Sequence, residues 1–138
     1  MRKTLIVASL SVLATPALAW QPITLYNRTD SARVNGVLFQ ASGVQPVGFF
    51  LYVPKGSQRT FGPLQEDGGP CLRYLSVQVQ SPQFNPPIAA MTATTQFDVC
   101  RETWIVVSGT WPDLTRIGTA PLKITHGGGS GPALAPMK

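Results

Sequence analysis

Prolines and glycines are spread so evenly along this chain that a helix of ordinary length has little room to form. The 138 residues include 13 of each, and no stretch repeats apolar residues at the i, i+3, i+4, i+7 spacing of a helix. Short runs of alternating apolar and polar residues recur instead, with turn-forming residues between them. The sequence therefore predicts an all-β fold.

Seven or eight of these runs are expected to be strands. The clearest is LRYLSVQVQ at 72–80, where apolar residues on one face alternate with polar residues on the other. The other runs lie at 23–27, 34–40, 49–53, 57–61, 92–99, 103–108 and 119–125. Gly36 lies inside one of them, where a bulge is expected. Strands of this number and length are typical of a small antiparallel β-sandwich or a partly open barrel.

The first 19 residues, MRKTLIVASLSVLATPALA, have the pattern of a signal peptide. Two basic residues precede an apolar run, and an Ala-x-Ala site ends just before Trp20. The run is shorter than the roughly 20 residues that cross a bilayer. We expect a signal peptide at 1–19, a β-sandwich domain at 20–125 and a flexible tail rich in Gly and Pro at 126–138. The destination would be the periplasm or the medium of a bacterium, with no integral membrane segment after cleavage.

The chain has two cysteines, Cys71 and Cys100. In an exported protein an even pair is expected to form a disulfide. A redox couple would favour a Cys-x-x-Cys spacing, and a metal site would need further ligands, of which only His126 could join the pair. We predict a structural disulfide, no metal site and no cofactor.

Four short motifs follow one another in a recognisable order: Asn27-Arg28-Thr29, Pro54-Lys55-Gly56-Ser57, Cys71-Leu72-Arg73-Tyr74 and Asp98-Val99-Cys100. In this order, the chain from Ile23 to Val107 resembles a group of small exported bacterial proteins of unknown function. The resemblance implies a β-sandwich with one disulfide, and it implies no activity. The proline-rich loop between the cysteines and the extended tail depart from that pattern.

Groups that could perform catalysis are few. His126 is the only histidine and three glycines follow it, so we interpret it as a solvated tail residue and not as a general base. Asp98 and Glu102 could approach each other as paired carboxylates do, but Asp98 is expected instead to accept hydrogen bonds from backbone amides at a strand end. Glu66 and Asp67 are assigned to a turn. The sequence predicts that the protein is not an enzyme.

The positive charge of the chain is modest and dispersed. Its formal net charge is +5. Loss of Arg2 and Lys3 with the signal peptide leaves nine basic and six acidic residues, a net charge of +3. Nucleic-acid binding surfaces usually gather their basic residues in a patch or stripe. No nucleic-acid partner is therefore expected.

The segment VGFFLYVP at 47–54 breaks the alternation, because Phe50 and Tyr52 would face away from the core while their neighbours fill it. Either other parts of the chain cover these two rings, or the rings form a binding surface, to which Phe84 in the proline-rich loop at 81–91 could contribute. We expect a non-catalytic binding or structural accessory protein, whose partner is another protein or a cell-surface polymer. The alternatives are an inhibitor that presents loop 81–91 to an extracellular hydrolase, a small-ligand carrier, and a hydrolase.

The predicted processing can be tested by the intact mass of the protein recovered from its own host. The mass should equal that of residues 20–138 less two hydrogens for the disulfide, because the peptidase should cut after Ala19 and export should oxidise the cysteines. Alkylation without reductant should add nothing. Retention of residues 1–19, or two thiols that alkylate freely, would contradict the prediction.

Overall fold

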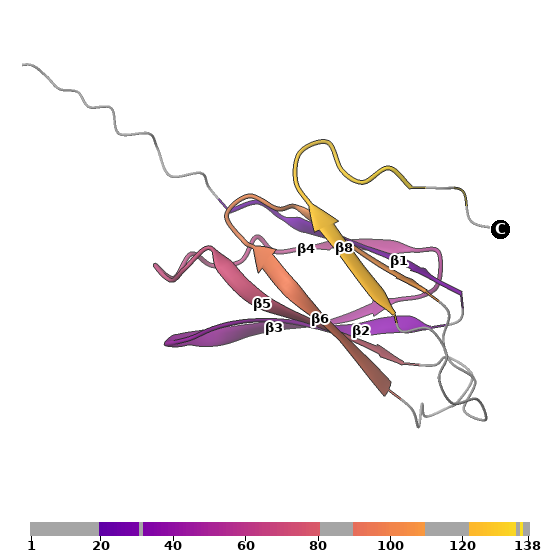
Figure 1. Cartoon of the computed structure of the whole chain (residues 1–138), viewed down its shortest axis with the longest axis horizontal. Helices are drawn as coiled ribbons and strands as arrows, with labels where there is room; N and C mark the ends of the chain where they lie inside the picture. Colours follow the sequence, from indigo (N-terminus) through magenta and orange to yellow (C-terminus); the bar gives the residue numbers. More distant parts are fainter. Residues whose placement is uncertain (1–19, 31, 81–89, 110–121, 135, 137–138) are drawn as a thin grey trace, which may run out of the picture.

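Two four-stranded sheets pack against each other in the structure, a computed structural model that describes residues 20–30, 32–80, 90–109, 122–134 and 136. Figure 1 shows the two layers. The strands are β1 (Ile23–Thr29), β2 (Arg33–Ala41), β3 (Val44–Val53), β4 (Gln58–Phe61), β5 (Leu72–Gln80), β6 (Ala90–Asp98), β7 (Trp104–Gly109) and β8 (Lys123–Gly127). This arrangement confirms the predicted all-β sandwich. No helix in the described residues is long and apolar enough to span a membrane.

The strand order is β4-β1-β7-β8 in what we call the first sheet and β3-β2-β5-β6 in the second sheet. Neighbouring strands run antiparallel with one exception. β1 and β7 are parallel, with Thr24 opposite Trp104 and Thr29 opposite Gly109. The expected antiparallel architecture is therefore corrected to one antiparallel and one mixed sheet. The whole second sheet lies between β1 and β7 in the sequence, so no hairpin turn fixes their relative direction.

Most strands lie where the alternation predicted them. β5 has the predicted bounds, and the register of β2 shifts between Val34 and Gly36 against both of its neighbours, as expected for a bulge. The tail boundary was wrong. β8 includes His126 and Gly127, which the sequence had placed in a flexible tail.

The core lies between the sheets and is rich in aromatic rings. Phe39 of β2 is fully buried and contacts Phe97 and Phe61, with ring centroids 5.5 and 6.3 Å apart. The apolar row of β5, represented by Leu75 and Val77, is also fully buried, as its alternation predicted. Phe61 comes from the first sheet and Phe39 and Phe97 from the second, so these rings join the two layers.

A buried polar cluster joins the sheets at one end. The side-chain amide of Asn27 in β1 donates to the carbonyl oxygens of Ala32 (2.9 Å) and Val53 (2.8 Å). Its Oδ1 accepts from the Thr29 hydroxyl (2.6 Å) and the Thr29 amide (3.0 Å). The strand predicted at 23–27 extends through this Asn-x-Thr motif to Thr29, and both polar side chains are buried.

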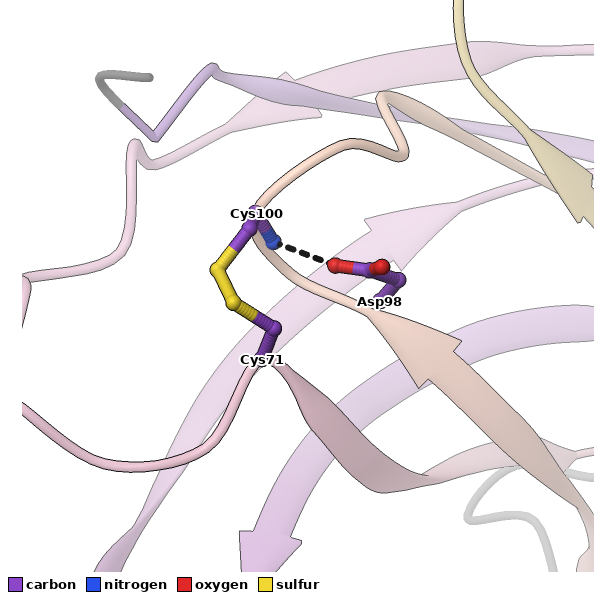
Figure 2. Close-up of side chains that lie close together, drawn as sticks. All are labelled: Cys71, Asp98 and Cys100. Carbon is purple, nitrogen blue, oxygen red and sulfur yellow. Dashed lines mark hydrogen bonds between the residues drawn. A yellow bond between two sulfur atoms is a disulfide. The ribbon is translucent and has the colours of Figure 1, made fainter. Parts of the chain in front are cut away.

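The predicted disulfide between Cys71 and Cys100 is present, with Cα atoms 5.3 Å apart. Cys71 directly precedes β5 and Cys100 follows β6 (Figure 2). The two strands are already paired there, since Leu72 lies opposite Asp98. The sulfurs therefore fasten the end of an existing ladder, as predicted for a structural disulfide.

Replacing both cysteines with serine should lower the free energy of unfolding by about 3 kcal/mol. The disulfide spans 29 residues, and closing a loop of this size removes roughly 3 to 4 kcal/mol of denatured-state entropy. Urea unfolding followed by circular dichroism measures the difference. The wild-type protein in strong reductant is the control and should match the double variant. An unchanged stability would show that the crosslink does not constrain the unfolded chain.

Candidate functional site

Phe50 is the most exposed large apolar side chain in the described part of the chain, at 95% of its surface, and Tyr52 is 59% exposed. Both lie on β3, whose alternate residues Leu51 and Val53 are buried in the core. The two faces of β3 therefore separate as the sequence indicated. Both rings are thus exposed among the described residues, but most of the loop at 81–91, which could cover them, lies outside those residues. Phe84 lies outside the described residues.

A hollow of about 450 Å³ opens beside Phe50 on the second sheet. Two glycines on neighbouring strands, Gly36 and Gly48, keep its floor low because neither carries a side chain. A Cβ at Gly48 would lie 3.4 Å from Cδ1 of Leu38, and one at Gly36 would lie 3.4 Å from Oε1 of Gln78. The remaining lining residues are Val37, Phe49, Ser76 and Thr92.

The strand register aligns the hollow across the whole sheet. Phe50 of β3 lies opposite Gly36 of β2, which lies opposite Gln78 of β5, which in turn lies opposite Thr92 of β6. The adjacent row consists of Gly48, Leu38, Ser76 and Thr94. Four strands span about 14 Å between the outermost chains. The hollow thus spans all four strands of the sheet, from the ring of Phe50 on β3 to the hydroxyl group of Thr92 on β6.

Two further apolar side chains lie along the same face of β5. Leu72 is 54% exposed and Tyr74 is 50% exposed. Tyr74 has the same side-chain parity in β5 as Ser76 and Gln78, so all three share the outer side of the second sheet. We call Phe50, Tyr52, Leu72 and Tyr74, together with the hollow, the binding face.

Every residue that lines the hollow is uncharged, whereas Arg33 and Asp98 lie beside Tyr52 and Leu72, the outlying members of the binding face. The guanidinium of Arg33 lies over the ring of Tyr52, 5.3 Å from its centroid, and its Nε is buried without a hydrogen-bond partner, as is Oδ1 of Asn35. The polar groups available in the hollow are therefore hydroxyls and an amide, which both donate and accept hydrogen bonds.

His126 is not the solvated tail residue that the sequence suggested. It lies in β8, where Nδ1 is hydrogen-bonded to Oε1 of Glu102 and Nε2 lies 3.4 Å from the hydroxyl of Thr95. Its ring also packs against Phe97, with centroids 5.6 Å apart. Hydroxyl, imidazole and carboxylate thus follow one another in the order of a nucleophile, a base and an orienting acid. Thr95 and His126 lie outside the lining of the hollow. The cluster bridges β6 of one sheet and β8 of the other, so its contacts join the two sheet edges.

Asp98 and Glu102 do come close, but through the backbone. Oδ1 of Asp98 accepts from the amide of Cys100 at 2.9 Å (Figure 2), and the amide of Asp98 donates to Oε2 of Glu102 at 2.6 Å. The expectation that Asp98 binds backbone amides is confirmed. Asp98 also lies close to both cysteine sulfurs, but sulfurs joined in a disulfide offer no thiolate ligand to a metal.

The glycines after His126 have a packing role that the sequence interpretation missed. A Cβ at Gly127 would lie 2.6 Å from the indole of Trp104, and one at Gly128 would lie 2.4 Å from the carbonyl oxygen of Arg101. The indole Nε1 of Trp104 donates to the carbonyl oxygen of Gly128 at 3.2 Å. These residues are small because other groups lie directly against their backbone. A sequence pattern cannot separate this cause from the flexibility of a linker.

Comparison with known protein families, with curated proteins and with solved structures found no match to this chain. Its function must therefore be inferred from the groups that its own surface presents.

Replacing His126 with alanine should lower the free energy of unfolding by about 1 to 2 kcal/mol. The change removes a hydrogen bond to a carboxylate and a ring contact from a partly buried position. Urea denaturation measures the loss. Lys123→Ala is the matched control, because Lys123 is an exposed residue of the same strand, and its effect should stay within about 0.5 kcal/mol. Equal effects of the two changes would restore the interpretation of His126 as a solvated residue.

Proposed function

We propose that this protein is a non-catalytic binding protein of the bacterial periplasm or cell exterior, and that its binding face takes a neutral polysaccharide of the cell surface. The observation that carries the proposal is the almost complete exposure of Phe50 at the edge of a hollow with an uncharged lining. Exposed apolar patches are associated with binding, and aromatic residues are enriched where interfaces gain most of their energy.

Chemical complementarity favours a saccharide. One side of a sugar ring presents C–H groups that can lie flat on an aromatic ring such as Phe50, while its hydroxyls point outward at the edges. Gln78, Ser76 and Thr92 offer side chains that can donate to and accept from such hydroxyls. An uncharged lining gives no advantage to an anionic or cationic polymer. A hollow that spans four strands also suits an extended chain better than a compact ligand.

The other functions considered from the sequence have less support. The proposed inhibitory loop, 81–91, lies for the most part outside the described residues. A carrier would need space between the sheets, where Phe39, Phe61 and Phe97 pack against one another. A partner protein could use the same rings, so it is treated as an outcome of the test below. The disulfide is compatible with an oxidising compartment and hence with export.

Affinity electrophoresis in native gels tests the proposal. Gels should contain one neutral polysaccharide each, a β-glucan, a mannan or a galactan, and we expect at least one of them to retard the protein. Phe50→Ala should weaken that retardation about tenfold or more, since aromatic anchors at the centre of an interface commonly contribute 2 kcal/mol or more. The free energy of unfolding of Phe50→Ala should stay within about 1 kcal/mol of the wild-type value, because the ring is almost fully exposed.

Leu134→Ala is the control, because Leu134 is also exposed but lies outside the binding face. It should leave the retardation unchanged. Gels with an anionic polysaccharide such as alginate should not retard the protein. The proposal fails if no neutral polysaccharide retards the wild type, or if Phe50→Ala is retarded equally. If no polysaccharide retards the protein, but Phe50→Ala abolishes a protein complex that the wild type forms, the binding face would be assigned to a protein partner instead.

A further inference from the structure

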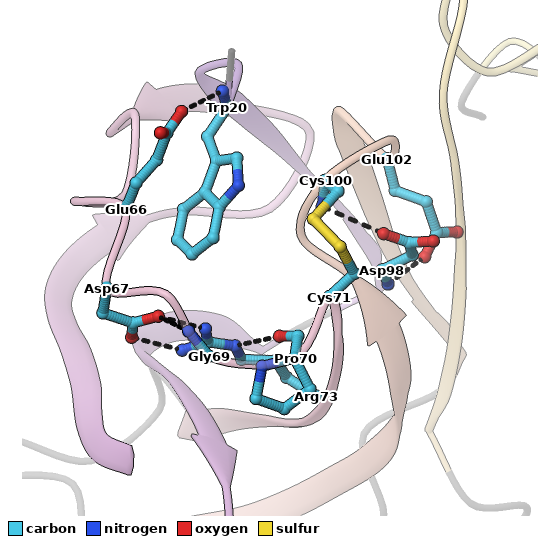
Figure 3. The surroundings of a disulfide bond; sticks show 10 residues. All are labelled: Trp20, Glu66, Asp67, Gly69, Pro70, Cys71, Arg73, Asp98, Cys100 and Glu102. Carbon is cyan, nitrogen blue, oxygen red and sulfur yellow. Dashed lines mark hydrogen bonds and ion pairs between the residues drawn. A yellow bond between two sulfur atoms is a disulfide. The ribbon is translucent and has the colours of Figure 1, made fainter. Parts of the chain in front are cut away.

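Trp20 lies at a corner of the fold, where neighbouring residues contact both its side chain and its backbone nitrogen. Its side chain packs against the hydrophobic core, and its ring lies under the guanidinium of Arg73, 5.2 Å from that group. Its nitrogen donates to Oε1 of Glu66 at 3.1 Å. Figure 3 shows the indole directed toward Arg73 with Glu66 beside the backbone nitrogen. A residue at the edge of the described chain is thus held at two points.

Arg73 is rigidly held. Its residue is only 2% exposed, and its side chain donates to both carboxylate oxygens of Asp67 at 2.6 and 2.8 Å and to the carbonyl oxygen of Pro70 at 3.0 Å. Asp67 is itself fixed by the amide of Gly69 at 2.9 Å. The hydrogen bonds from Arg73 lower the pKa of Asp67 to about 2, so the pair stays ionised at neutral pH. This network presents a fixed cationic surface to the Trp20 ring.

We propose that Glu66 is the receptor for the amino terminus that signal-peptide removal creates at Trp20. This inference goes beyond the proposed binding function and rests on the predicted cleavage after Ala19. A processing peptidase adds one water across the Ala19–Trp20 peptide bond. Ala19 leaves as a carboxylate, and the nitrogen of Trp20 becomes an amine that takes up a proton below its ordinary pKa of about 8.

Cleavage changes the contact with Glu66 from a neutral hydrogen bond to an ion pair. Before cleavage the Trp20 nitrogen is an amide with one N–H. Afterwards it is an ammonium with three donors facing a carboxylate, and charge-assisted hydrogen bonds are shorter and stronger than neutral ones. The ion pair therefore attaches Trp20 more firmly to the corner formed by Glu66, Asp67 and Arg73. Cys71 belongs to the same stretch of chain (Figure 3), so processing and disulfide formation both stabilise residues 66–73.

A two-by-two set of variants tests this inference. The first pair is the wild-type chain and Glu66→Gln, both exported and processed to Trp20. The second pair carries one glycine inserted between Ala19 and Trp20, which leaves the new ammonium one residue away from Glu66. Intact mass verifies each terminus. In the first pair, we expect Glu66→Gln to lower the melting temperature by about 3 °C, the size of effect expected for an exposed ion pair. In the second pair, the ammonium is displaced from Glu66, so the same substitution should lower the melting temperature by about 1 °C or less.

The pH dependence supplies a second readout. In the first pair, the difference in melting temperature between the wild type and Glu66→Gln should be complete near pH 6 and should disappear near pH 9.5, as the ammonium loses its proton. Asp67 and Arg73, the other charged groups that meet this corner, keep their charges over that range. Equal effects of Glu66→Gln in both pairs, an effect that does not change with pH, or a mature chain that starts elsewhere would overturn the proposal.

Discussion

The buried amide of Asn27 is the contact on which the sandwich most depends at one end, because it connects a strand of the first sheet to the backbone of the second. It satisfies the carbonyl oxygens of Ala32 and Val53 and is itself oriented by Thr29. A buried carbonyl or amide left without a partner costs about 1 to 3 kcal/mol. The disulfide fastens the β5–β6 ladder. Together these contacts hold the second sheet in place at its backbone and at one end of its β5–β6 ladder.

The strands could be predicted because their signals are local. Alternation within LRYLSVQVQ defines β5 by itself, and Gly36 marks the bulge in β2. The parallel pairing of β1 with β7 could not be predicted, since it joins residues about 80 positions apart. His126 was misplaced for a similar reason. The residues that follow it are glycines, but its partners Glu102 and Thr95 lie elsewhere in the chain. A glycine run looks the same in sequence whether it is a linker or packs against a tryptophan.

The candidate site was predicted in part. The broken alternation of VGFFLYVP identified Phe50 and Tyr52, because only one side of a strand can face the core. The hollow beside them depends on the register that sets Gly36 opposite Phe50 and Gly48 opposite Leu38. Neither glycine is informative alone. The Arg73–Asp67 pair was also missed, since nothing in the motif Cys71-Leu72-Arg73-Tyr74 shows that its arginine occupies the buried row of β5.

The parallel pairing of β1 with β7 constrains when this fold can form. The second sheet is assembled from β2, β3, β5 and β6, which lie close together along the chain. β1, by contrast, can pair with β7 only after residues 104–109 have been made. A chain that emerges amino-terminus first cannot complete the first sheet until β7 and β8 have emerged. Contacts of such long sequence separation slow folding. Until residues 104–109 emerge, β1 would therefore have one edge paired with β4 and its other edge open to incorrect backbone partners.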